Sequence, residues 1–119
     1  MKAKRIFISA GMIQGGQSGV ARYVIQLIQA LVRLRPSWTW VVAGLESDKA
    51  FFDSQGEALE WISIPNRFRS GAANLFWHQF YLPGILRKRN IDLVHIPSYR
   101  RILARPPAPQ IATIHDCAP

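Results

Sequence analysis

The sequence predicts an α/β domain in which a mostly parallel sheet is covered by helices on both faces. Five short runs of β-branched, aromatic and other apolar residues alternate with longer polar or helical segments. The runs are almost continuously apolar, as expected for strands of a parallel sheet that is buried on both faces. Between the first two runs, apolar residues recur at the spacing of one helix face, and this strand–helix–strand order is typical of parallel pairing.

The first three elements carry the clearest patterns. The run "RIFISA" (5–10) predicts a buried strand, which Gly11 ends. Residues 20–34 predict an amphipathic helix, and Ser18 is a suitable N-cap for it. The segment 11–19 holds four glycines and connects this strand to this helix.

The rest of the chain predicts four more strands and a second helical region. The strands are expected at 38–44, 60–65, 92–97 and 110–116. Residues 45–58 predict a polar loop with one short helical turn, and residues 72–89 a helix that Pro83 and Gly84 should divide into two pieces. Ligands bind such sheets beyond the carboxyl ends of the strands, so site residues are expected in the loops that follow the strands.

The composition fits one globular unit with a basic surface. The chain has 119 residues, 49% of them hydrophobic, and 15 basic against 7 acidic residues give a formal net charge of +8. Nucleic acid, an anionic membrane surface and a phosphorylated small molecule are all compatible with this charge, which alone does not choose among them. The single cysteine, Cys117, cannot form an intramolecular disulfide.

The sequence also favours a cytoplasmic location. No apolar run approaches the roughly 18 residues that a membrane-spanning helix needs. The basic start followed by "RIFISA" imitates a signal peptide, but "QGGQSG" rather than a small-residue cleavage site comes after it. Peripheral contact with the inner face of a membrane remains compatible with the basic composition.

The glycine-rich segment nearly matches two phosphate-binding patterns and satisfies neither. Gly11 and Gly16 fit G-x-x-x-x-G-K-[ST], but Gln17 stands where the lysine is needed. In G-x-G-x-x-G, Gln14 stands in place of the first glycine. What remains is the start of a helix, where free N–H groups and the positive end of the helix dipole favour an anion. The ordinary alternative is a strand-to-helix turn whose glycines allow tight packing.

The histidines differ in what their positions indicate. His115 and Asp116 end the last predicted strand at the edge where ligands bind, although such a pair is by itself more often structural. His95 is expected to be a packed, hydrogen-bonded sheet residue, and His78 a helix-surface residue. Three histidines and one cysteine at these spacings form no zinc pattern.

Basic residues gather in the second half of the chain. They are Arg67, Arg69, Arg87, Lys88, Arg89, Arg100, Arg101 and Arg105. Solvated faces account for most of them. Next to the aromatic residues of "NLFWHQFYLP", the same cluster could also hold the protein on an anionic leaflet.

Four stretches, taken in order and spacing, carry a resemblance to a known family. They are "GGQSGVARYVIQLIQAL", "WHQFYLPGIL", "DLVHIPSY" and "IATIHDCAP". With them the chain resembles the N-terminal domain of group 1 (family 4) glycosyltransferases, which have the GT-B fold. The resemblance implies a Rossmann-like domain and identifies residues 1–119 as part of the acceptor-side half. His78 departs from it, because relatives often carry glutamate in a "WEQ" sequence there.

The resemblance also implies a reaction and its residues. It predicts transfer of a hexose from a UDP- or GDP-sugar to a glycan or lipid-linked acceptor, with retention at the anomeric carbon and in polysaccharide biosynthesis. Gly15 and Gly16 resemble the family's loop near the donor's diphosphate, and with Ser18 they are the predicted donor-binding residues. His115 resembles the histidine that contacts the donor sugar, and Asp116 the acid after it; these are the predicted catalytic residues. No metal, cofactor or nucleic-acid partner is expected.

The length of the chain limits what the resemblance implies. In relatives, a C-terminal domain holds the nucleotide, and no stretch of the 119 residues corresponds to it. The chain by itself is therefore expected to be an incomplete and inactive enzyme. The alternative is a non-catalytic α/β module, either a truncated product or the partner subunit of a separately encoded C-terminal half.

Overall fold

A computed structural model describes residues 3–98 and 101–112, with the side chains of 54–58 left out. Five strands form one parallel sheet in the order β3-β2-β1-β4-β5. The strands are β1 (Arg5–Ser9), β2 (Thr39–Leu45), β3 (Leu59–Ile64), β4 (Leu93–Ile96) and β5 (Gln110–Ala112). The chain builds outward from β1 to β3 and then returns to the other side of β1. The order therefore reverses between β1 and β4, which is where sheets of this type bind ligands. The predicted α/β fold with a parallel sheet is confirmed.

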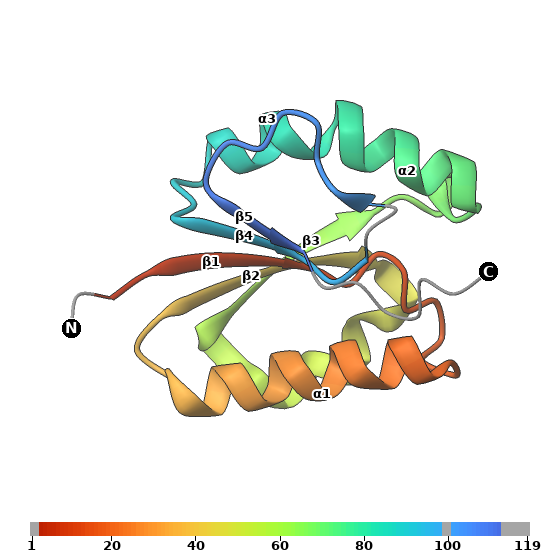
Figure 1. Cartoon of the computed structure of the whole chain (residues 1–119). Helices are drawn as coiled ribbons and strands as arrows, with labels where there is room; N and C mark the ends of the chain where they lie inside the picture. Colours follow the sequence, from red (N-terminus) through yellow and green to blue (C-terminus); the bar gives the residue numbers. More distant parts are fainter. Residues whose placement is uncertain (1–2, 99–100, 113–119) are drawn as a thin grey trace.

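Helical segments cover both faces of the sheet (Figure 1). Helix α1 (Gly19–Leu34) lies on one face with the 3₁₀-helical segment η1 (Glu46–Ala58) beside it. Helices α2 (Gly71–Phe80) and α3 (Leu82–Arg87) lie on the other face, after a short 3₁₀ turn, η2 (Asn66–Phe68).

The two faces of the sheet form two separate hydrophobic cores. Phe7, Val41 and Val94 belong to the core beneath α2 and α3. Ile8 and its register partner Val42 belong to the core against α1. Because successive side chains of a strand point to opposite faces, a sheet buried on both sides needs continuous apolar runs, which is the pattern in the sequence.

Helix α1 forms as the sequence predicts. Its buried residues Ala21, Val24, Ile28 and Val32 are three or four positions apart and make one apolar face. The Ser18 hydroxyl accepts a hydrogen bond from the Ala21 N–H at 3.0 Å, which satisfies one of the free donors of the first turn.

Two segments differ from the prediction in extent. The division of the second helical region is confirmed, but it falls at Tyr81, before Pro83. Pro83 occupies the first turn of α3, where its missing N–H removes no hydrogen bond within that helix. Residues 46–58 are 3₁₀-helical throughout, more than the single turn expected.

Candidate functional site

The glycine-rich connection between β1 and α1, residues 11–19, lies at the carboxyl edge of the sheet and is called the glycine loop below. In Figure 1 it runs from the end of β1 to the start of α1. The ends of β2 and β3 lead into η1 and η2 at the same edge. The loop therefore lies beside the point where the strand order reverses.

The backbone of the glycine loop turns through left-handed conformations. The φ angles are +33° at Gln14, +92° at Gly15 and +72° at Gly16. Such angles disfavour residues with a Cβ atom. At Gly16 a Cβ would also lie 2.8 Å from the Phe51 ring, whereas at Gly15 nothing lies within 4 Å. Packing within the protein thus explains part of the glycine content, and Gly15 is the left-handed position that faces open space.

Two neighbouring segments hold the loop in place. The Gly15 N–H donates to Asp48 Oδ1 at 2.9 Å, and the Gln14 side-chain amide donates to the Arg69 carbonyl at 2.6 Å. The Gly16 N–H donates to the Ile13 carbonyl at 2.9 Å. The N–H groups of both central glycines are therefore occupied. The first turn of a helix also carries N–H groups without partners inside the helix, and in α1 Ser18 satisfies that of Ala21.

Asp48 is a buried acid that the sequence analysis did not single out. It is 1% exposed, and its Oδ2 atom has no hydrogen-bond partner within the described part of the chain. It lies three residues after the end of β2, in one of the loops where site residues are expected. This position is the sequence signal by which Asp48 could have been identified as a candidate. Its carboxylate lies against Gly15 and disfavours a second negative charge at that glycine.

A buried polar network lies beneath the glycine loop. Ser9, Asn74 and His78 are each fully buried. The His78 Nε2 atom lies 2.6 Å from Ser9 Oγ, and Nδ1 lies 2.8 Å from the Asn74 carbonyl oxygen. A carbonyl only accepts, so Nδ1 carries the proton and Nε2 accepts from the Ser9 hydroxyl. The prediction that His78 lies on a helix surface is wrong. His78 follows Asn74 by four residues, about one turn of α2, so both side chains lie on the helix face that packs on the sheet.

The network fixes the first residue of the loop. The Gly11 N–H donates to Ser9 Oγ at 3.3 Å, and the Asn74 side-chain amide donates to the Gly11 carbonyl at 3.2 Å. Arg101 Nε donates to Asn74 Oδ1 at 2.8 Å, which ties the β4–β5 connection to the same group. Ser9 and His78 have the separation of a nucleophile and its base, but their complete burial excludes a substrate from them.

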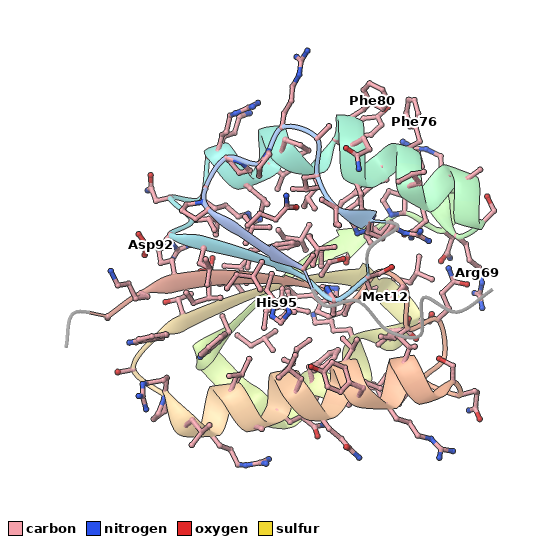
Figure 2. The ribbon with its side chains drawn as sticks, viewed as in Figure 1. Met12, Arg69, Phe76, Phe80, Asp92 and His95 are labelled. Carbon is pink, nitrogen blue, oxygen red and sulfur yellow. The ribbon has the colours of Figure 1, made fainter. Side chains whose placement is uncertain are left out.

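Burial controls the charge of two histidines. Desolvation lowers the pKa of His78 to about 4, the hydrogen bond to the Asn74 carbonyl opposes this, and the positive charge of Arg101 adds to it. Burial also lowers the pKa of His95, a half-buried residue of β4 that lies against the α1 side of the sheet (Figure 2). The expectation that His95 is a packed sheet residue is confirmed.

The structure places some of the predicted site residues and not others. Gly15, Gly16 and Ser18 lie together at the start of α1, with Ser18 acting as the helix cap. His115 and Asp116, the predicted catalytic pair, lie outside the described residues, as does Cys117. Within residues 3–98 and 101–112, no three histidine, cysteine, aspartate or glutamate side chains gather as metal ligands would. In the same ranges no helix is both long and apolar enough to cross a membrane.

Comparison with known proteins identifies the family. Residues 17–119 match the family described as Glycosyltransferase Family 4. Comparisons with curated proteins and with solved structures gave no match. The family match begins inside the glycine loop and includes α1, the α2–α3 region and all strands after β1. Together with the parallel sheet in the order described above, this match shows that the chain belongs to glycosyltransferase family 4.

Proposed function

We propose that the chain is the N-terminal part of a retaining glycosyltransferase that transfers a hexose from a UDP- or GDP-sugar to a glycan or lipid-linked acceptor. The observation that carries the proposal is the glycine loop, which is left-handed at Gly15 and Gly16 and leads into the capped start of α1. It lies where the strand order reverses, at the carboxyl edge of the sheet. Membership of family 4 supports the class of reaction.

The hydrogen bonds of the loop indicate where a diphosphate would bind. Asp48 already accepts the Gly15 N–H, and its charge disfavours an anion there. In the first turn of α1 the Ala21 N–H is capped by Ser18, but within the described residues the N–H groups of Gly19 and Val20 form no hydrogen bond. The positive end of the helix dipole lies at the same place. We therefore place the donor's diphosphate at the first turn, next to Ser18 and Gly19, with Gly15 and Gly16 shaping the approach.

Backbone NMR of the full chain tests this site. Inorganic pyrophosphate, UDP and GDP are titrated separately, and amide shifts are expected at residues 17–20. Gly19→Val should abolish them, because Gly19 has open space around its Cβ position and a branched side chain would obstruct that space without a clash inside the protein.

Helix α2 offers a matched control for this test. It also has a serine N-cap, Ser70, and a first residue, Gly71, with open space around it. Gly71→Val should leave the shifts at residues 17–20 unchanged. Equal effects of Gly19→Val and Gly71→Val, or saturable shifts confined to α2, would refute the proposed donor site.

We further propose that His115 contacts the donor sugar and that Asp116 assists it, as the family resemblance implies. In an active protein that contains this chain, His115→Ala should lower kcat/KM about 100-fold, roughly the effect of losing one transition-state hydrogen bond. The measurement is steady-state kinetics, with circular dichroism to compare folding. Near-normal kcat/KM in the folded variant would assign His115 a structural role.

The remaining elements of the proposal concern location and completeness. We propose a cytoplasmic protein of polysaccharide biosynthesis that works with a nucleotide-sugar-binding half, because a two-domain cleft needs donor contacts from both sides. The 119-residue chain alone should then show no turnover of UDP- or GDP-sugars. Turnover by the purified chain would refute the need for a second half.

A further inference from the structure

The outer side of α2 exposes a cluster of aromatic rings. Phe80 is 72% exposed, Phe76 48% and Tyr81 47%. The Phe76 and Phe80 rings lie 4.7 Å apart between centroids, and Phe76 lies 6.0 Å from Tyr81. Figure 2 shows Phe76 and Phe80 projecting from α2 away from the sheet. Neither phenylalanine contributes to the two cores.

A groove continues this apolar surface. It has a volume of about 750 Å³ and lies between α2, α3 and the connection at residues 102–105. Its apolar lining includes Leu75, Phe80, Pro83 and Ile102, and its charged lining consists of Arg87 and Arg105. Exposed apolar surface bordered by cations is typical of an interaction site.

The charge around the groove is of one sign. No aspartate or glutamate occurs between residues 61 and 91, which include α2 and α3. Asp92 follows, and it accepts a hydrogen bond from the Arg5 backbone N–H at the amino edge of the sheet. Within the described residues, Arg87 and Arg105 form no ion pair. The face therefore combines aromatic rings with arginines whose charges are not balanced locally.

This combination favours a lipid surface over a second copy of the chain. In a two-fold dimer the same patch meets itself, so the arginines of the two copies would face each other without carboxylates between them. An anionic bilayer supplies phosphates for the arginines and a headgroup region in which exposed aromatic rings are stable.

We propose that the α2–α3 face docks on an anionic lipid bilayer, with Phe76 and Phe80 entering the headgroup region and Arg87 and Arg105 pairing with lipid phosphates. This inference goes beyond glycosyl transfer and does not depend on it. Helix α2 begins at the edge that carries the glycine loop, so docking brings the candidate site close to the bilayer.

Vesicle co-sedimentation of the full chain tests the electrostatic part. Vesicles of phosphatidylcholine alone are compared with vesicles that contain about three parts of phosphatidylglycerol to seven parts of phosphatidylcholine. We expect binding to the anionic vesicles at 50 mM NaCl, where the Debye length is roughly 14 Å. At about 500 mM NaCl the charges are screened, and we expect release. Arg87→Gln/Arg105→Gln should weaken binding about tenfold or more, since each cation near an anionic surface contributes about a fivefold factor.

A control pair removes the same amount of positive charge from α1, which lies on the other face of the sheet from α2 and α3 (Figure 1). Arg22 and Arg33 are exposed residues of α1, and Arg22→Gln/Arg33→Gln should weaken binding much less than the groove pair. Equal losses from the two pairs would mean that net charge alone attracts the chain, and would overturn the proposed face. Equal binding to neutral and anionic vesicles would overturn it as well.

The aromatic part has its own pair of variants. Phe80→Ser should lower anionic-vesicle binding about tenfold, and its exposure means that the fold does not depend on it. Leu34→Ser on α1 is the control, because Leu34 is 65% exposed on the opposite layer. If the chain binds no vesicles and forms a dimer in light scattering that Phe80→Ser dissociates, the face is assigned to a second copy and the proposal is refuted.

Discussion

His78 is held neutral by the same contacts that position the glycine loop. Its Nδ1 atom donates to a backbone carbonyl and its Nε2 atom accepts from Ser9, whose hydroxyl also accepts the Gly11 N–H. Protonation would add a donor at Nε2, where the Ser9 hydroxyl already donates. The loop conformation therefore depends on an uncharged imidazole.

The first prediction follows from the lowered pKa of His78. Its value falls from 6.5 to about 4 on folding, so the unfolded chain binds the proton more tightly. The stability contribution is complete above pH 6.5 and is lost as the pH falls from 6.5 to 4. The loss should reach about 3 kcal/mol of unfolding free energy, measured by urea denaturation at a series of pH values.

A variant separates His78 from the other histidines. His78→Gln cannot titrate in this range, so its unfolding free energy should be lower at pH 7.5 but should change less towards pH 4.5. His95→Gln serves as the comparison, because burial lowers the pKa of His95 in the same direction. If the unfolding free energy of His78→Gln depends on pH as that of the wild type does, protonation of His78 is not the cause of the stability lost at low pH.

At the scale of elements, two glycines should respond in opposite ways to a methyl group. Gly84 lies inside α3 with nothing within 4 Å of its Cβ position, so Gly84→Ala should stabilise the helix by about 0.5–1 kcal/mol. At Gly11 a Cβ would lie 2.8 Å from His78 Cε1 and 2.9 Å from Ile64 Cδ1. Gly11→Ala should therefore destabilise the protein by about 1–3 kcal/mol.

Thermal unfolding monitored by circular dichroism measures both effects. We expect the Tm of Gly84→Ala to rise by about 3 °C and that of Gly11→Ala to fall by more. A lower Tm for Gly84→Ala would show that the packing of α3 differs from the structure. An unchanged Tm for Gly11→Ala would show that the network beneath the loop can move aside.

Elements with a simple period were predictable from the sequence. The apolar runs identified the strands because both faces of the sheet are buried, and the spacing of Val24 and Ile28 identified α1. The length of η1 was not predictable, because its polar residues give no apolar period and 3₁₀ geometry has little sequence signature.

The position of the glycine loop was predictable, but the contacts that hold it were not. The glycines indicated a loop at the start of α1, and Ser18 indicated the cap. The buried state of His78 and the bond from Gly15 to Asp48 depend on residues that are distant in sequence and meet only in the folded sheet. A single sequence contains no local signal for such pairs, because they arise from the way α2 and η1 pack on opposite faces.

At the scale of the whole molecule, positive charges exceed negative charges, and few of them are paired with a carboxylate in the described residues. The formal net charge is +8, and the ion pairs found in the described residues join Arg5 and Arg89 to the same acid, Glu60. Both pairs are partly exposed, so they contribute little to stability. Repulsion among the remaining cations should therefore be the larger electrostatic effect in the folded protein.

The last prediction is that salt stabilises the protein. Raising NaCl from 20 to 200 mM shortens the Debye length from roughly 20 Å to 7 Å, which screens repulsion between cations far apart on the surface more than contacts such as Arg5 Nη2 to Glu60 at 2.9 Å. We expect the Tm to rise by about 2–4 °C at pH 8, where the histidines are neutral. Arg22→Gln/Arg33→Gln removes two of the cations and should raise the Tm at 20 mM NaCl and reduce the response to salt. A Tm that falls with salt would mean that attractive ion pairs, rather than repulsion, dominate the folded state.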